Sequence, residues 1–340
     1  MRPLLASALV VALTAGASAN DKAAAPVPAQ TRALMAQRGM DPSAPVLIRV
    51  YKKESQLEVW KKTRAGAYAL LKTFPICRWS GQLGPKRKQG DRQAPEGFYA
   101  VAQRQLNPNS AYYLSFDTGF PNAYDRAHGA SGSALMVHGT CSSAGCYAMT
   151  DVQVGEIYAL VRDALDAGQP AFQFQAFPFR MTAENMAKHR TDPHIDFWRQ
   201  LKEGSDRFEA TGEEPLVRVA AGRYAFKTAS PDKEAVAADR VAREKERVAA
   251  LVAEGGAAIR TTYADGGQNA IFAAMAKRGL SLGMVSRPEA LAYAGREVTL
   301  IPARPQPKPV IAASPEARPS PITTIAGAAP ILEARFVPRS

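Results

Sequence analysis

Apolar and alternating stretches dominate the chain between residues 45 and 137, and they predict β-strands. Residues 46–51 form a nearly continuous apolar run, and residues 56–60 alternate between apolar and polar side chains. The polar residues between these two stretches predict a hairpin turn. Further strands are expected at residues 67–74, 98–104, 111–116 and 133–137, and the last of these leads into His138.

Helical periodicity replaces alternation after residue 150. Thr150 and Gln153 have the spacing of a capping box, and Gly168 marks the expected end of the helix. Its apolar face comprises Val154, Ile157, Tyr158, Val161 and Leu165. A strand over residues 172–177 and helices over residues 182–189 and 196–204 follow. Strands joined by short turns, with a few helices, indicate an α+β domain that is mainly β and covers residues 44–225.

The segments that flank this domain differ from it in composition. Residues 20–43 are rich in Ala, Pro, Gln and Arg, and they predict a flexible lead-in. Residues 226–296 contain an alanine-rich, charged stretch that predicts a solvated helical segment. Residues 297–340 are rich in proline, which is typical of an extended, disordered tail.

The first residues have the organisation of a secretory signal peptide. Arg2 provides a positive charge, residues 4–13 form a short apolar run, and residues 17–19 (ASA) resemble a cleavage site. The run is shorter than the roughly 20 residues that a transmembrane helix needs, although an uncleaved anchor is the alternative. We therefore expect residues 1–19 to be removed, leaving a periplasmic protein without a transmembrane segment.

The chain is basic, with 43 Lys and Arg residues against 31 Asp and Glu residues and a formal net charge of +12. Such a charge can indicate nucleic-acid binding, but no nucleic-acid motif is present. For an exported protein the charge favours attraction to an anionic envelope polymer or membrane surface. A solvated basic surface without a partner is the alternative. We expect neither a nucleic-acid partner nor a cofactor.

His138 and Cys146 are joined by a short stretch of small residues, and together they can form a cysteine nucleophile and its base. A nearby imidazole can generate and stabilise a thiolate. Gly145 permits close approach of the backbone to a substrate carbonyl, and N–H groups in the motif around Ser143, Gly145 and Tyr147 are candidate oxyanion donors. Chance proximity of a histidine and a cysteine in a glycine-rich loop is the alternative.

Other polar residues give weaker indications. Tyr124, Arg126 and His128 precede the predicted catalytic strand and could bind substrate, with Arg126 pairing with a carboxylate. A role in organising their own loop is the alternative. His189 and His194 lack a nearby cysteine or acidic cluster in the sequence, so we expect no metal site.

The segment over residues 136–151, MVHGTCSSAGCYAMTD, resembles the active-site signature of the L,D-transpeptidase catalytic domain (the YkuD-like fold), in particular its YafK-like branch. Further similarities occur in the same order within residues 45–225. They are WSGQLGP at residues 79–85, GDRQAPEGFY at 90–99, LSF at 114–116, FPNAYDR at 120–126 with His128-Gly129, and FPFRMT at 177–182.

The resemblance implies that Cys146 is acylated and that His138 accepts its proton. Similar enzymes act on the tetrapeptide stems of peptidoglycan and form an acyl-enzyme at the L-centre of meso-diaminopimelate. They then pass the acyl group to an amine or to water. The resemblance therefore implies a peptidoglycan-modifying L,D-transpeptidase without a cofactor or metal.

Two departures from the broader family leave the acyl acceptor open. The broader motif has a histidine two residues before the nucleophile and an arginine shortly after it, where this chain has Ala144 and Tyr147-Ala148-Met149. Both departures fit the YafK-like branch. They favour, as an alternative, an amidase that releases a diaminopimelate-linked lipoprotein from peptidoglycan. A catalytically silent wall-binding module is the alternative from a different class.

The chain contains three cysteines, so at least one has no partner within the chain. With Cys146 as the nucleophile, only the pairing of Cys77 with Cys141 leaves it free. We therefore expect a structural disulfide between Cys77 and Cys141, which an oxidising compartment permits. The alternative is that both of these thiols are free.

Overall fold

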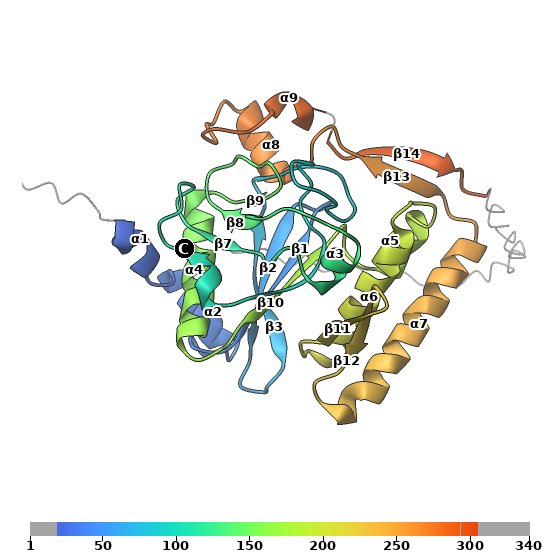
Figure 1. Cartoon of the computed structure of the whole chain (residues 1–340), viewed down its shortest axis with the longest axis horizontal. Coiled ribbons are helices and arrows are strands. Elements are labelled where there is room, and N and C mark those ends of the chain that lie inside the picture. Colours follow the sequence, from blue (N-terminus) through green and yellow to red (C-terminus); the bar gives the residue numbers. More distant parts are fainter. Residues whose placement is uncertain (1–18, 293, 305–340) are drawn as a thin grey trace, which may run out of the picture. The chain divides into compact units, whose positions relative to one another are not determined.

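The computed structural model describes residues 19–292 and 294–304 (Figure 1). All but the last residue of the predicted signal peptide, and residues 305–340 of the predicted tail, lie outside the described residues. Within the described ranges, no helix is both long enough and apolar enough to cross a membrane.

Five strands form the first sheet, in the order β3-β2-β1-β10-β5. They are β1 Val46–Tyr51, β2 Gln56–Lys62, β3 Tyr68–Pro75, β5 Gly97–Val101 and β10 Phe172–Phe177. The predicted hairpin of β1 and β2 is confirmed, and β10 runs parallel to β1. β5 is shorter than predicted because residues 103–105 form a 3-10 turn, in which the Gln105 side chain accepts a hydrogen bond from the Ala102 N–H at 2.9 Å.

The second sheet has the order β4-β9-β8-β7-β6. Its short strands are β4 Arg78–Trp79, β6 Leu106–Asn107, β7 Ser115–Asp117, β8 Met136–His138 and β9 Tyr147–Ala148. β8 and β9 are parallel, and the other pairs are antiparallel. β7 begins later than predicted because Tyr113 has a left-handed backbone, with φ of 69°, which a strand cannot continue.

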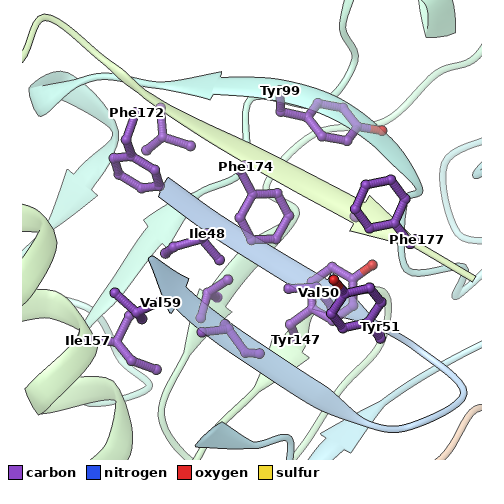
Figure 2. Close-up of a cluster of buried hydrophobic side chains, with 14 of the residues drawn as sticks. Ile48, Val50, Tyr51, Val59, Tyr99, Tyr147, Ile157, Phe172, Phe174 and Phe177 are labelled. Carbon is purple, nitrogen blue, oxygen red and sulfur yellow. The ribbon is translucent and has the colours of Figure 1, made fainter. Parts of the chain in front are cut away.

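Aromatic side chains from β10 join the two sheets (Figure 2). Phe172 lies edge-on to Phe116 of β7 with ring centroids 5.5 Å apart, and Phe174 lies 5.9 Å from Tyr147 of β9. Ile157, on the helix that follows β9, is also fully buried. Each aromatic pair stabilises the fold by about 0.5–1.5 kcal/mol beyond the burial of its surface. Because Tyr147 directly follows Cys146, this core fixes the position of Cys146 at the point where the chain enters β9.

Helices surround the sheets and confirm an α+β fold. They are α1 Ala19–Ala24, α2 Ala29–Gln37, α3 Ala123–Ala127, α4 Asp151–Asp166, α5 Ala183–Lys188, α6 Ile195–Thr211, α7 Glu234–Ala253, α8 Ala270–Lys277 and α9 Pro288–Leu291. The capping box of α4 is confirmed, since the Thr150 hydroxyl accepts a hydrogen bond from the Gln153 N–H at 3.3 Å.

Helix α6 continues well past Gly204, where the sequence predicted its end. A Cβ atom at Gly204 would lie 2.4 Å from the Phe98 ring, so glycine here permits close packing of α6 rather than ending it. The helix ends instead at Gly212, which has a φ of 64°.

The prediction of a flexible lead-in over residues 20–43 is wrong. This segment contains α2, in which Thr31 and Met35 are buried. The Thr31 hydroxyl donates to the carboxylate of Glu156 on α4 at 2.5 Å. Alanine favours the helix, and burial against α4 holds it in place.

The C-terminal boundaries also need correction. A hairpin of β11 Leu216–Ala220 and β12 Arg223–Lys227 crosses the predicted boundary at residue 225. After α7, β13 Ala258–Thr262 pairs with β14 Arg296–Ile301, so the proline-rich tail cannot begin at residue 297. The β-branched residues Val298, Thr299 and Ile301 favour a strand, and the long-range partner β13 completes it.

Candidate active site

The pairing of β8 with β9 places His138 and Cys146 on the same side of the second sheet. Val137 lies opposite Tyr147, and His138 lies opposite Ala148. Side chains alternate across a strand, so Val137 and Tyr147 face the core while His138 and Cys146 face away from it. The sequence-predicted pair is therefore brought together by one register. The Met136 N–H lies 3.4 Å from the Cys146 Sγ, as this register requires.

One nitrogen of the His138 ring is already engaged. Its Nδ1 lies 2.5 Å from the carbonyl oxygen of Gly139, and a carbonyl can only accept. Nδ1 must therefore carry the proton, which leaves the lone pair of the neutral ring on Nε2. The ring is buried, and burial lowers the pKa of His138. The histidine is thus held as a neutral imidazole.

Tyr112 covers His138, and sequence reasoning missed it. The two ring centroids are 4.7 Å apart and the rings are inclined by 34°. Tyr112 is 43% exposed, whereas His138 is buried. Its pattern predicted a strand residue, whereas it lies in the turn before β7, where the Tyr112 carbonyl accepts from the Gly139 N–H at 3.0 Å.

The thiol of Cys146 is half-buried and is the free thiol of the chain. Burial raises its pKa, partly offset by the hydrogen bond from Met136; Asp117 also raises this pKa and Lys86 lowers it. Sγ also lies 3.6 Å from the carbonyl oxygen of Ala134, which can accept the thiol proton. The free protein thus favours a neutral thiol beside a neutral imidazole over an ion pair.

The reactivity of Cys146 should therefore rise with pH through an unusually high range. Only the thiolate is alkylated, and a raised pKa leaves less thiolate at pH 7 than in a free cysteine, whose pKa is about 8.5. We expect the iodoacetamide rate to keep rising above pH 9, as measured by intact mass. A rate plateau extending down to about pH 5 would instead indicate a preformed thiolate–imidazolium pair.

Residues 139–146, which follow His138 and end with Cys146, form a loop that we call the nucleophile loop. The Ser143 hydroxyl accepts hydrogen bonds from the N–H groups of Gly145 at 3.3 Å and Cys146 at 3.1 Å. It also lies 2.7 Å from the Cys146 carbonyl oxygen, to which it donates. The N–H groups of Gly145 and Cys146, at the centre of the motif that the sequence suggested as a source of oxyanion donors, are therefore occupied within the loop in this conformation.

The loop also depends on two glycines. Gly145 has a φ of 135°, which disfavours any other residue, and a Cβ there would lie 3.0 Å from Leu135. At Gly139, a Cβ would lie 2.5 Å from the Asp151 carboxylate. Asp151 begins α4 and accepts from the Thr140 N–H at 2.9 Å. The N-terminus of α4 therefore braces the turn after His138.

A disulfide anchors the start of the nucleophile loop. The structure joins Cys77 to Cys141, with Cα atoms 5.3 Å apart, and leaves Cys146 as the free cysteine. Both bonded cysteines are buried against Phe272 of α8. Cys77 precedes β4, whose Trp79 pairs with Tyr147, so the bond ties the loop to the sheet whose strand β9 begins directly after Cys146.

Tyr124 and His128, two of the three predicted substrate-binding residues, are engaged in packing. Tyr124 is buried, and its ring stacks on His128 at 4.1 Å and on Tyr224 at 4.6 Å. Tyr124 and His128 line a surface cavity of about 660 Å³, and Arg126 lines a separate one of about 450 Å³. Neither lining includes His138 or Cys146, so a substrate role for these residues stays a prediction.

Metal binding has no evident site in residues 19–292 and 294–304, where no three His, Cys, Asp or Glu side chains group closely enough to hold an ion. His189 is buried, stacks on Phe179 and lies 3.2 Å from the Thr261 hydroxyl. It therefore has a packing role.

Known proteins resemble part of the chain. The family model of the L,D-transpeptidase catalytic domain (YkuD) matches residues 45–172. Two proteins named "Putative L,D-transpeptidase YafK", from Escherichia coli strain K12 and Escherichia coli O157:H7, are each 50% identical over 181 residues. This match covers 53% of the chain and 73% of either relative.

Solved structures give only a weak likeness. The helical cell shape determining protein Pgp2 from Campylobacter jejuni has a TM-score of 0.31 and 15% identity, covering 68% of this chain and 80% of that one. Bd1075 of Bdellovibrio bacteriovorus has a TM-score of 0.28 and 22% identity, covering 40% and 49%. TM-scores this low do not establish a common fold.

Proposed function

The chain belongs to the L,D-transpeptidase family, and on that premise we propose that it modifies peptidoglycan outside the cytoplasm through an acyl-enzyme on Cys146. Its substrate would be the stem peptide that contains meso-diaminopimelate. The predicted signal peptide and the basic net charge of +12 support a location next to an anionic envelope polymer.

The reaction would proceed in two acyl transfers. As the Cys146 sulfur attacks the carbonyl carbon at the L-centre of diaminopimelate, its proton passes to Nε2 of His138. The tetrahedral intermediate collapses, the C–N bond breaks, and the leaving amine takes the proton from His138. An incoming amine or water then loses a proton to His138 and attacks the thioester. The thiol re-forms as that proton returns to sulfur.

The contact between His138 Nδ1 and the Gly139 carbonyl oxygen is the observation that carries this proposal. The bond from Nδ1 to the Gly139 carbonyl leaves Nε2 as the basic nitrogen, and the β8–β9 register puts that ring on the same face as the thiol. A neutral base next to a neutral thiol suits proton transfer during attack, so no preformed ion pair is required.

A hydrolytic amidase that releases a diaminopimelate-linked protein is the second candidate. Ala144 stands where the broader family has a histidine, and Tyr147 lies in the short stretch where that family has an arginine. Ala144 is exposed, whereas Tyr147 is fully buried with its hydroxyl donating to the Pro95 carbonyl at 2.5 Å. Tyr147 therefore supplies no polar side chain to the substrate, and residues 147–149 contain no arginine.

Product analysis distinguishes these functions. Purified protein and its Cys146→Ala variant are incubated with sacculi, and the muropeptides and released proteins are identified by mass spectrometry. New diaminopimelate–diaminopimelate cross-links that require Cys146 would establish transpeptidation. Cysteine-dependent release of a wall-bound protein would establish the amidase. Identical products with both proteins would contradict a cysteine-dependent enzyme and would favour the alternative of a catalytically silent wall-binding module.

A further inference from the structure

A segment far along the chain reaches the nucleophile loop. Residues 265–287, which we call the C-terminal strap, follow β13 and include α8. They lie outside residues 45–172, the part that matches the family model. The strap nevertheless supplies two polar side chains, Asp265 and Ser286, to the surroundings of Cys146.

Ser286 bonds both backbone polar groups of Ser143. Its hydroxyl accepts from the Ser143 N–H at 2.9 Å and donates to the Ser143 carbonyl at 2.8 Å. One side chain therefore replaces the backbone partners that a regular strand would give this residue. In turn, the Ser143 hydroxyl binds the N–H and the carbonyl oxygen of Cys146, at 3.1 and 2.7 Å. Ser143 therefore links the strap to Cys146 through hydrogen bonds on both sides.

Asp265 supports the same point through an arginine. Its buried carboxylate accepts from Arg92 Nη2 at 2.6 Å and lies 3.4 and 3.5 Å from guanidinium nitrogens of Arg78 and Arg287. Arg92 Nη2 also donates to the Ser143 carbonyl at 3.0 Å. Although burial opposes the shift, the hydrogen bond from Arg92 helps to lower the pKa of Asp265, so the carboxylate is charged at neutral pH. It can thus orient Arg92 towards the loop.

Two further contacts fix the strap against the domain. The Gly267 N–H and carbonyl exchange hydrogen bonds with Trp79 of β4, both at 3.0 Å. Phe272, with Met275 and Val285 beside it, packs on the buried disulfide. The strap therefore packs on β4 and on the Cys77–Cys141 disulfide, and both of these contact the nucleophile loop or the strand next to it.

We propose that Ser286 and Asp265 are positioning residues that hold the Cys146 thiol in its catalytic orientation through Ser143. Neither residue contacts the thiol, so each acts through the backbone of the loop. The proposal rests on the proposed role of Cys146 as the nucleophile. It predicts that loss of either side chain frees the thiol from its half-buried position while impairing its use in catalysis.

The test compares Ser286→Ala and Asp265→Asn with Ser286→Thr, which keeps the hydroxyl. Glu297→Gln is the matched control, because it removes a strand β14 carboxylate that pairs with Lys53 at 2.7 Å. For each protein, the iodoacetamide rate of Cys146 is measured against pH without reductant. Then kcat and KM are measured on a diaminopimelate-containing stem peptide, and Tm by calorimetry.

The expected signature is a pair of opposite changes. Alkylation at pH 7 should rise about tenfold in Ser286→Ala and Asp265→Asn, the effect of about one pKa unit on the thiolate fraction. Their kcat should fall about tenfold to a hundredfold with KM nearly unchanged, because misplaced groups lose rate rather than binding. Ser286→Thr should recover most of the wild-type values, and Glu297→Gln should match wild type.

Alkylation rates and pH profiles within twofold of wild type in both folded variants would overturn the proposal, as would an equal change in Glu297→Gln. A fall in Tm without a change in alkylation would show a purely structural strap and would also overturn it. If the wild type turns over no stem peptide, the proposed function fails, but the alkylation profile still decides whether Ser286 and Asp265 position the thiol.

Discussion

Replacing Cys146 with alanine, or His138 with asparagine, is expected to lower kcat about 10³-fold or more, the size of effect seen when a nucleophile or its base is removed. Burial raises the pKa of the Cys146 thiol and lowers the pKa of His138, so neither group is active alone. Without an imidazole to take its proton, the thiol must react through its small thiolate fraction.

The two residues should behave as one unit. The double variant is expected to be no slower than Cys146→Ala alone, because residues that act in the same step are not additive. Raising the pH should partly restore His138→Asn, which can use hydroxide-generated thiolate, but not Cys146→Ala. The measurement is single-turnover release of product from a stem peptide between pH 6 and about pH 10.

A matched control is available on α6. His194 occupies the N-cap position of that helix without a capping hydrogen bond from its side chain, and it packs near Trp198, with ring centroids 6.0 Å apart. Asparagine is a good N-cap residue, so His194→Asn should fold and retain wild-type turnover. A His138→Asn variant as fast as His194→Asn would rule out His138 as the base.

Removal of the disulfide is expected to lower the free energy of unfolding by about 4 kcal/mol, from the chain-entropy relation for a loop of this length. Cys77 and Cys141 are separated by 64 positions in sequence, and the closed loop contains β5 of the first sheet and every strand of the second except β9. The measurement is urea unfolding of Cys77→Ala/Cys141→Ala beside wild type, with and without reductant.

Reductant should lower the free energy of unfolding of wild type towards that of the double variant, and it should leave the value of the variant unchanged. Cys146→Ala, which keeps the disulfide, should lose stability on reduction as wild type does. Wild-type stability that is indifferent to reductant would show that the bond does not form in solution. Non-reducing peptide mapping provides the direct check, and a dominant disulfide containing Cys146 would contradict the pairing.

Much of the architecture follows from local sequence. A continuous apolar run predicted β1, alternation of apolar and polar residues predicted β2 and β10, and the spacing of Thr150 and Gln153 predicted the start of α4. These features depend on residues close in sequence, which set side-chain periodicity and capping directly. Local patterns failed where packing at a distance took over. Gly204 is tolerated inside α6 because Phe98 packs against it, and β14 exists because β13 pairs with it.

The candidate site shows the same division. The sequence by itself determined the chemistry available, since the segment around His138 and Cys146 contains a thiol, an imidazole and the glycines that allow their loop. Only the tertiary structure decided how they are arranged. The β8–β9 register turns both side chains to one face, and the Gly139 carbonyl selects the basic nitrogen of His138.

No local sequence pattern predicts the contacts of the C-terminal strap. Ser286 bonds Ser143 across 143 positions of sequence, and Asp265 meets Arg92 across 173. Such contacts depend on how separate elements pack, and a lone serine or aspartate in a loop carries no periodicity or motif that would predict them. The sequence therefore determined which residue can be the nucleophile, whereas long-range packing decided what holds that nucleophile in place.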